Sequence, residues 1–331
     1  MEKIIAVIVS HNRHTLLAKC IEAIRNQSEL PNTILVVNNG SSDYTSVWLD
    51  KQTDIIQLYQ ENAGPAGGYH TGIKWAYENG YDFIWCMDDD SCPKNDALEM
   101  LFKHRGPNVE LLNSVVINNA DKSSFVWKTK NYTRLEEVKT DVIEGISQPF
   151  NGTLIHRSII EKAGLPKSNL FYWGEGSEYF YRVVNKFKIP AKTVTNSIQY
   201  HPQQNIGMNQ EWDLKTSWKM YFFVRNRYQV LKAKYNNPIM AFVLYCCFVF
   251  AFSAMMLIKQ KENKIKKASF AFWPMIHAFT SNYSANDISI QMRMHEISAS
   301  PITASIIKSV SKFLRAVFVP SENEVSKTAT A

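Results

Sequence analysis

The chain has 331 residues and a formal net charge of +7, and 45% of its residues are hydrophobic. This composition excludes disorder over most of the length, and the length suits a large α/β domain with an extension, or two domains. The five cysteines are odd in number and lack zinc-type spacing, which favours reduced thiols in a reducing compartment. Basic residues gather in the C-terminal third, but no helix-turn-helix, RNP-like or OB-like pattern accompanies them, so we expect no nucleic-acid partner.

The first half of the chain alternates segments typical of strands and helices. Strands are predicted at Ile4–Val9, Ile34–Val37, Ile55–Tyr59, Phe83–Met87 and Leu111–Ile117. Helices are predicted near Leu16–Asn26 and from the glycine-rich stretch Gly64–Gly68 to about Glu78. This alternation predicts an α/β fold with a mostly parallel sheet, whose ligands bind at the carboxyl ends of the strands.

Three consecutive aspartates, Asp88, Asp89 and Asp90, directly follow the fourth predicted strand. Because side chains alternate along a strand, Asp88 and Asp90 can face one way while Asp89 faces the other. Carboxylates this close stay ionised together only with a cation between them, and Mg²⁺ or Mn²⁺ holding a diphosphate suits such oxygen ligands. The alternative is a solvated acidic turn that caps the helix after Pro93.

The glycine-rich stretch lacks both the ending of a P-loop and the spacing of the dinucleotide fingerprint. We therefore interpret it as a tight strand-to-helix turn near a ligand, in preference to a phosphate cradle.

The order of several short motifs along the chain is specific. The motifs are Val7–Arg13, Val36–Asp43, Asn62–Gly68, Asp88–Asp90, Phe150–Ile155, Gly164–Pro166, Phe171–Glu175 and Glu178 with Tyr179 and Arg182. This series resembles the family 2 glycosyltransferases, which are inverting enzymes with the Rossmann-like, nucleotide-sugar-binding GT-A fold. Within that family it is most similar to the galactofuranosyl- and rhamnosyltransferases of bacterial envelope polysaccharides, and the likeness covers about residues 4–230.

The resemblance implies a donor site. Ser10, Asn12 and Arg13 lie where the family holds the base and ribose, and Asn38 takes the place of a uridine-binding aspartate. The other residues predicted to bind the nucleotide sugar are Gly67, Asp89 and Trp173. Asp89 would orient the donor, while Trp173 would stack on a sugar or, equally, be a core or rim aromatic.

The resemblance also implies a metal site. Asp88 and Asp90 match the Asp-x-Asp pair that carries Mn²⁺ or Mg²⁺ in the family, where the ion neutralises the departing nucleoside diphosphate. His201 matches a histidine that completes the metal shell, although a lone histidine is more often a structural residue.

The catalytic base departs from the family pattern, which reads Trp-Gly-Asp-Asp-x-Glu-Tyr. Here Gly176 stands where the second acid, the usual base, is expected. Glu175 is our first candidate to deprotonate the acceptor hydroxyl and Glu178 the second. The alternative is that both are ordinary acids favoured by a helix N-terminus. We expect Arg182 to pair with Glu178.

Two segments of the C-terminal third suggest a membrane surface. The run Ile239–Ile258 carries no charge, yet both its flanks are basic, which favours an interfacial helix, a re-entrant hairpin or a buried helix over a single span. Ser300–Pro320 predicts an amphipathic helix with Lys308, Lys312 and Arg315 on its polar face, suited to anionic lipid. The alternative is a helix packed on the catalytic domain or at a dimer interface.

Together these patterns predict a catalytic domain at residues 1–230, a helical membrane-associated region at 231–320 and a disordered tail at 321–331. The predicted reaction moves a sugar from UDP-galactofuranose or dTDP-rhamnose to a lipid-linked glycan. We expect a peripheral or monotopic protein on the cytoplasmic face of the inner membrane, without a secretory signal, and homo-oligomerisation is left open. The alternatives are a catalytically inactive nucleotide-sugar-binding partner in an assembly complex and a nucleotidyltransferase.

Overall fold

The computed structural model describes residues 2–145, 149–203 and 210–318. The chain divides into two compact units, which are described separately below. Unit 1 comprises Met1–Phe171 and Glu175–Asn205, and unit 2 comprises Tyr172–Gly174 and Ile206–Ala331. The predicted boundary at residue 230 lies within a helix of unit 2, and the predicted tail lies outside the described residues.

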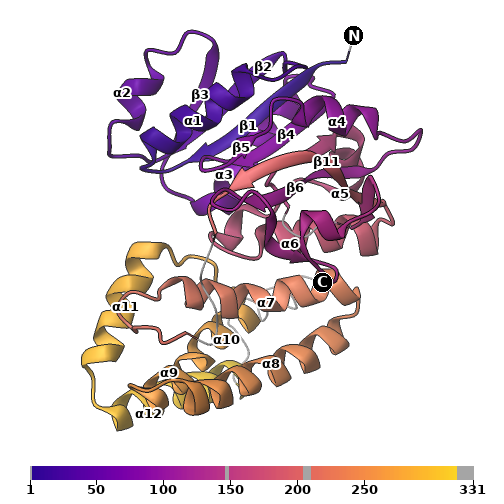
Figure 1. The fold of residues 1–331 in the computed structure, drawn as a ribbon. Coiled ribbons are helices and arrows are strands. Elements are labelled where there is room, and N and C mark those ends of the chain that lie inside the picture. The colour runs from indigo at the N-terminus through magenta and orange to yellow at the C-terminus, as the bar shows by residue number, and fades with distance from the viewer. Residues whose placement is uncertain (1, 146–148, 204–209, 319–331) are drawn as a thin grey trace, which may run out of the picture. The chain divides into compact units, whose positions relative to one another are not determined.

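Unit 1 is built on one mixed sheet with the strand order β3-β2-β1-β4-β10-β6-β11-β5 (Figure 1). Four of its strands are parallel neighbours, as predicted: β1 (Ile4–Ser10), β2 (Thr33–Asn39), β3 (Ile55–Gln60) and β4 (Phe83–Asp88). The sequence did not predict β10 (Thr153–His156), which runs antiparallel between β4 and β6 (Leu111–Asn118). Beyond β6, the strand β11 (Ala191–His201) is parallel to it. The shorter strands are β5 (Cys92–Pro93), β7 (Ser124–Thr129), β8 (Tyr132–Arg134) and β9 (Val142–Glu144).

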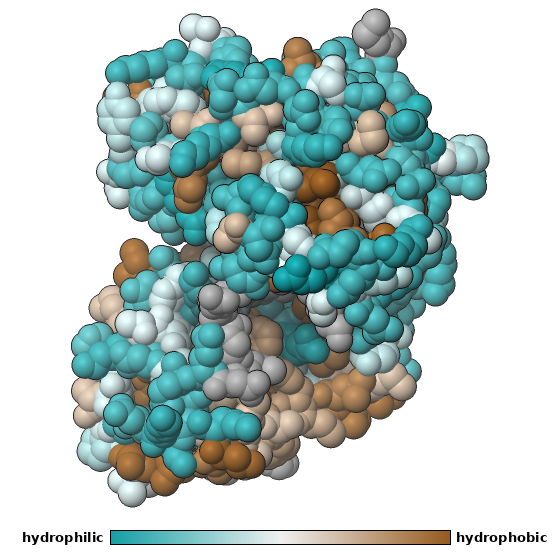
Figure 2. Space-filling model, viewed as in Figure 1, coloured by the Kyte–Doolittle hydropathy of each residue, from teal (hydrophilic) through white to brown (hydrophobic). Residues whose placement is uncertain are grey.

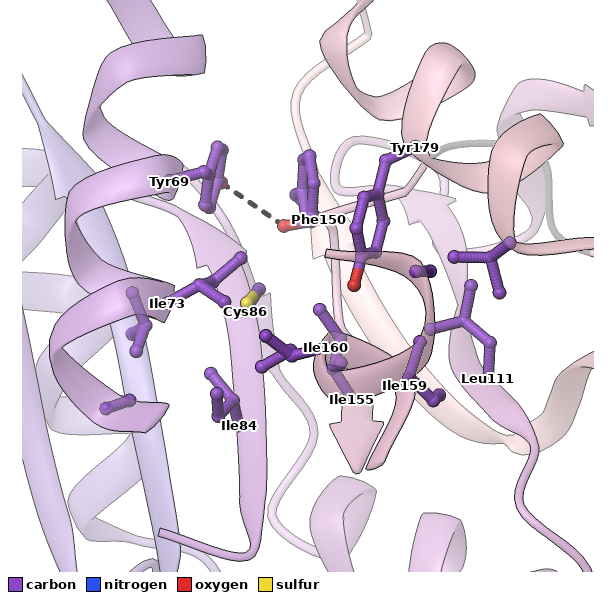
Figure 3. Close-up of a cluster of buried hydrophobic side chains, with 14 of the residues drawn as sticks. Tyr69, Ile73, Ile84, Cys86, Leu111, Phe150, Ile155, Ile159, Ile160 and Tyr179 are labelled. Carbon is purple, nitrogen blue, oxygen red and sulfur yellow. Dashed lines mark hydrogen bonds between the residues drawn. The ribbon is translucent and has the colours of Figure 1, made fainter. Parts of the chain in front are cut away.

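Helices cover both faces of this sheet, which explains why its central strands are almost continuously apolar. The helices are α1 (His14–Arg25), α2 (Thr45–Leu49), α3 (Gly64–Glu78), α4 (Ala97–Lys103), α5 (Arg157–Ala163) and α6 (Glu175–Tyr181), with short turns at Leu135–Glu137, Ser168–Leu170 and Arg182–Lys186. On one face, Tyr69 and Ile73 of α3 join Phe150, Ile159 of α5 and Tyr179 of α6 in one buried cluster (Figure 3). That cluster fixes the start of α3 and of α6 against the carboxyl end of β4.

The glycines of α3 let the helix lie very close to the sheet. A Cβ on Gly68 would come 2.3 Å from a methyl of Val9, and one on Gly72 would come 2.5 Å from a methyl of Val7. Neither space admits a larger residue without movement of β1. The glycine-rich stretch Gly64–Gly68 thus forms the start of α3, directly after the turn from β3, and its close packing is in line with the interpretation that it is not a phosphate cradle.

Unit 2 is helical. Its helices are α7 (Lys219–Tyr235), α8 (Pro238–Lys259), α9 (Lys264–Phe270), α10 (Phe272–Phe279), α11 (Asp287–Ala299) and α12 (Ile302–Phe318). The helix α8 packs on α7 and α9, while α12 packs on α9 and α10. The predicted amphipathic helix therefore exists, and its Phe313 contacts Phe272 of α10. The side chains of Ile307, Val310, Leu314 and Arg315 lie outside the described residues.

One side of α8 is covered by protein and the other is bare. Tyr245, Val249 and Phe252 are among its buried residues. The exposed side carries a line of large apolar residues, which are Ile239, Met240, Phe242, Val243, Phe250, Leu257 and Ile258. Figure 2 shows hydrophobic surface where α8 lies in Figure 1. Among the described helices, α8 is the one long and apolar enough to cross a membrane, and 28% of its apolar window is buried.

Candidate active site

The ends of two strands bring an imidazole to the aspartates. Asp88 is the last residue of β4, and His201 is the last residue of β11. The His201 Nε2 atom lies 3.0 Å from Asp90 Oδ1 and 3.9 Å from Asp88 Oδ2. One potential ligand atom from each of the three residues falls within 4.8 Å of the others. The three predicted metal ligands therefore form one cluster.

Neighbouring groups hold each member of this cluster in place. The Tyr69 hydroxyl donates to Asp88 Oδ1 at 2.5 Å, and the Asn151 amide donates to Asp88 Oδ2 at 3.0 Å. His201 is fully buried, and its Nδ1 lies 2.7 Å from the carbonyl oxygen of Pro202. A carbonyl can only accept, so Nδ1 carries a proton, and Nε2 faces the aspartates, where it would present a lone pair to a bound cation.

The donor set fits a divalent cation. His201 Nε2 and Asp90 Oδ1 are buried and have no aligned hydrogen-bond partner among the described residues, although they lie 3.0 Å apart. Buried polar atoms are normally satisfied, so these two atoms need positive charge between them, which a proton on Nε2 or a bound cation supplies. Two carboxylates and one imidazole suit a small divalent ion.

The electrostatics agree with this fit. Burial, followed by the carboxylate of Asp90, raises the pKa of Asp88 above its ordinary value. Burial also acts to raise the pKa of Asp90, but His201 and Arg13 outweigh it, so the pKa of Asp90 is lowered. For His201, burial acts to lower the pKa, but Asp90 and Asp88 outweigh it and the pKa is raised. Each carboxylate thus needs nearby positive charge to stay ionised.

Asp89 faces a different set of partners, as the alternation along the strand predicts. Its Oδ2 accepts from the Ser10 hydroxyl at 2.8 Å, and its Oδ1 accepts from Arg13 at 3.1 Å. Arg13 also donates to Asp90 Oδ2 at 2.7 Å, so it bridges two aspartates. Burial raises the pKa of Asp89 to about 7. Ser10, Arg13 and Asp89 thus form one network beside the cluster of Asp88, Asp90 and His201.

The ends of the motifs Val7–Arg13 and Val36–Asp43 meet at the sheet edge. Asn12 has a φ of 55° and its side-chain oxygen accepts from the backbone N–H groups of Ser42 and Asp43 at 2.7 and 3.2 Å. Asn38 is fully buried, accepts from the Ser41 N–H at 3.0 Å and donates to the Ser46 hydroxyl at 3.0 Å. Both asparagines hold the loop together. Contact of either with a nucleotide stays a prediction, and for Asn38 it requires exchange of these bonds.

Gly67 lies in the first turns of α3 and is buried. A Cβ added there would come 2.3 Å from Ala63 Cβ, so the residue serves helix packing. Contact of Gly67 with a donor stays a prediction.

Glu175 begins α6 and carries an unsatisfied carboxylate oxygen. Its Oε2 is buried without a hydrogen-bond partner among the described residues, although the residue as a whole is half-buried. Burial, with a smaller contribution from the charge of Asp88, raises the pKa of Glu175 to about 7. A carboxylate of this pKa is suited to accept a proton near neutrality.

Residues 5–162 match the family described as glycosyl transferase family 2. This chain carries a family 2 glycosyltransferase domain. It is 27% identical over 215 residues to the galactofuranosyltransferase GlfT1 of Mycobacterium tuberculosis, a match that covers 61% of this chain and 70% of that protein. It is also 25% identical over 281 residues to the dTDP-rhamnosyl transferase RfbF of Shigella flexneri, with 80% of this chain and 90% of that protein covered.

Solved structures confirm the fold of the glycosyltransferase. The structure of S. aureus TarS in complex with UDP-GlcNAc superimposes with a TM-score of 0.55 at 11% identity, and the match covers 95% of this chain and 90% of that one. At such low identity the likeness shows the GT-A fold alone. The predicted fold class is therefore confirmed. The match of residues 5–162 and the two relatives confirm the predicted family, a glycosyltransferase family.

The carboxylate of Glu178, the second candidate base of the transferase, forms ion pairs with two cationic side chains. It is buried, its Oε1 lies 3.1 Å from both Arg182 Nε and Lys167 Nζ, and Arg182 also donates to its Oε2 at 3.2 Å. Arg182 further donates to the carbonyl of Leu165 at 3.0 Å and to that of Ala163. The predicted pair of Arg182 with Glu178 is confirmed. This geometry favours Glu175 as the base and gives Glu178 a positioning role for α6.

The glycine that replaces the usual acid is packed against a proline. A Cβ on Gly176 would lie 3.1 Å from the carbonyl oxygen and 3.2 Å from the Cβ of Pro149. The backbone there leaves little room for a side chain. A side chain at this position would require a small shift of Pro149, while the preceding residue supplies a carboxylate with a buried oxygen.

Trp173 belongs to unit 2, where its ring stacks edge-on to Phe223 at 6.2 Å and its carbonyl accepts from Asn226 at 2.6 Å. Stacking on a sugar stays a prediction. The sequence interpretation assigned no role to Tyr69 or Asn151, although both hold Asp88. Asn151 lies in a quoted motif, but no spacing rule connects either residue to the aspartates.

Proposed function

We propose that this transferase moves galactofuranose or rhamnose from a nucleotide sugar to a lipid-linked glycan, with inversion at the anomeric carbon. The relatives named above support these two sugars, with UDP-galactofuranose first and dTDP-rhamnose second. The single observation that carries the proposal is the convergence of Asp88, Asp90 and His201 at the carboxyl ends of β4 and β11. In α/β sheets this edge is where ligands bind.

In this proposal the cluster holds Mn²⁺ or Mg²⁺, which would neutralise the charge of the departing diphosphate. The chain's own residues prepare that site before a donor arrives. Tyr69 and Asn151 fix the Asp88 carboxylate, and the Pro202 carbonyl fixes the imidazole of His201. The Arg13 guanidinium, bonded to Asp89 and Asp90, adds positive charge beside the same carboxylates.

Glu175 would accept the proton of the acceptor hydroxyl. As that O–H bond breaks, the oxygen forms a bond to the anomeric carbon from the face opposite the diphosphate, and the bond from that carbon to the diphosphate oxygen breaks. The negative charge of Glu175 thus passes to the nucleoside diphosphate, and the carboxyl keeps the proton. The Glu178–Arg182 pair keeps α6, and with it Glu175, in a fixed position.

We also propose that unit 2 lies on the cytoplasmic face of the inner membrane. The exposed apolar line of α8 supports an orientation parallel to the membrane, with Tyr245, Val249 and Phe252 toward protein and the opposite side toward lipid. A helix of 22 residues extends about 33 Å, which is enough for several lipid contacts. Because α12 packs on α9 and α10, α8 replaces α12 as the main apolar contact in this proposal.

A panel of nucleotide sugars tests the reaction. Purified protein is incubated with each donor and a polyprenyl-diphosphate-linked glycan, with Mn²⁺, with Mg²⁺ or with a chelator. We expect transfer from UDP-galactofuranose or dTDP-rhamnose that requires the ion. Binding of UDP without transfer or hydrolysis of any donor would refute the proposal, and pyrophosphate release from a nucleoside triphosphate would indicate a nucleotidyltransferase instead.

A further inference from the structure

A cavity with a cationic wall lies inside unit 2, between α10, α11 and α12. Its volume is about 230 Å³. Trp273 and Ile276 of α10 form apolar lining, while Arg293 of α11 and Lys308 and Lys312 of α12 bring positive charge. Among the described residues that line the cavity, Glu296 is the one acid, and it pairs with Arg293. Three cations against one carboxylate leave a net charge of about +2 at this cavity.

The spacing of these residues along α11 and α12 lets their side chains line the same cavity. Lys308 and Lys312 are four residues apart on α12, and Arg293 and Glu296 are three apart on α11, so each pair lies on one side of its helix. No carboxylate among the described residues pairs with either lysine. Burial, then the charges of Arg293 and Lys308, lowers the pKa of Lys312. The two lysines thus add positive charge, which no described carboxylate offsets, beside the Arg293–Glu296 pair, and this favours an anionic ligand at the cavity.

Contacts between aromatic rings connect the helices that line this cavity to the exposed side of α8. Phe250 of α8 stacks edge-on to Phe272 of α10 at 5.7 Å, and Phe272 contacts Phe313 of α12 at 6.2 Å. Phe313 directly follows Lys312 in the chain. An amphiphile with an apolar tail on this aromatic surface and an anionic head near Lys312 would match both features.

We propose that the α10–α11–α12 cavity is a phosphate-binding site, and that the phosphate belongs to the head group of an anionic lipid. Arg293 offers a planar fork for two phosphate oxygens, and the two lysines act as compact charges beside it. The site is remote in sequence from the residues of the proposed reaction and goes beyond it. It rests on the proposed function only in the membrane contact of unit 2.

The test uses the full chain and two variants of equal charge change. The cavity variant is R293Q/K308Q/K312Q, and the control is K259Q/K261Q/K264Q, which alters exposed lysines at the end of α8 and the start of α9. Sedimentation is measured with vesicles of phosphatidylcholine alone and of phosphatidylcholine with phosphatidylglycerol. Binding of inorganic pyrophosphate is measured by calorimetry in the presence of a chelator. If the triple cavity variant does not fold, as judged by its melting temperature, K308Q/K312Q replaces it, because both lysines are exposed.

We expect the cavity variant to lose about tenfold or more in affinity for the anionic vesicles, and the control to lose clearly less. Loss of pyrophosphate binding in the cavity variant alone, with equal vesicle binding by both variants, would support the phosphate site but with a soluble source. Equal loss in both variants, or no loss of either ligand in the cavity variant, would overturn the proposal. Donor turnover is measured separately, so failure here leaves the proposed reaction intact.

Discussion

Replacement of Glu175 by glutamine tests the proposed base through two independent consequences. The substitution keeps the shape of the side chain and removes its ability to take a proton. General-base catalysis contributes about 10²–10⁴-fold, so we expect transfer to fall by that factor while donor binding persists. In the wild type, transfer should increase about tenfold per pH unit below pH 7 and level off above it, because the pKa of Glu175 is about 7.

The second consequence concerns stability. The folded-state pKa is raised above the ordinary 4.5, so the folded state binds more protons than the unfolded chain between these values. Stability conferred by the neutral carboxyl is therefore fully present below pH 4.5 and is lost as the pH rises through 7. The rise in the pKa of Glu175 corresponds to about 3 kcal/mol of unfolding free energy for a fully buried group. For this half-buried residue, solvent screening lowers the contribution to about 2 kcal/mol.

Urea unfolding of both proteins at pH 5 and pH 8 measures this effect. E175Q should be more stable than the wild type by about 2 kcal/mol at pH 8 and nearly equal to it at pH 5. E178Q serves as the comparison, since it should lose stability at both pH values through the orphaned Arg182. Transfer by E175Q at the wild-type rate, or a stability difference that does not change with pH, would refute the reasoning.

Three further predictions follow from the contacts described above. Asp90→Asn removes one charged ligand and should weaken Mn²⁺ binding, measured by calorimetry with UDP present, by about 10- to 100-fold, whereas unchanged affinity would exclude Asp90 as a ligand. Arg182→Met should destabilise the protein by about 3 kcal/mol in urea unfolding, because it leaves the buried carboxylate of Glu178 short of a partner. The double variant E178Q/R182M should recover part of this loss of stability, and no recovery would contradict an ion-pair role. Gly72→Ala should cost about 1–3 kcal/mol because its Cβ would come 2.5 Å from Val7, and a neutral result would show that α3 can move from the sheet.

The parallel half of the sheet could be predicted because its strands are short apolar runs between turn residues. Predicted Phe83–Met87 and observed Phe83–Asp88 differ by one residue. The antiparallel strand β10 was missed because its four residues are short for any periodicity, and its place between β4 and β6 depends on pairing across the sheet.

The convergence of Asp88, Asp90 and His201 was predictable from the aspartates and the resemblance, but the residues that hold them in place were not. Tyr69 lies 19 residues from Asp88 and Asn151 lies 63 residues from it, so only the fold brings them together. The ion pair of Lys167 with Glu178 likewise depends on the conformation of the loop that carries Lys167, which no local sequence pattern predicts. Gly176 could be recognised as a departure, while its contact with Pro149 required the folded backbone.

The bond from His201 Nδ1 to the Pro202 carbonyl has an evolutionary consequence. Many metal-binding histidines rely on a neighbouring carboxylate side chain to fix their tautomer, and a single mutation can delete that side chain. Here the acceptor is a backbone oxygen supplied by the next residue, which every amino acid carries. Drift in the surrounding sequence therefore cannot remove the acceptor itself, so Nδ1 can keep its proton and Nε2 can keep facing the aspartates while the residues around them diverge.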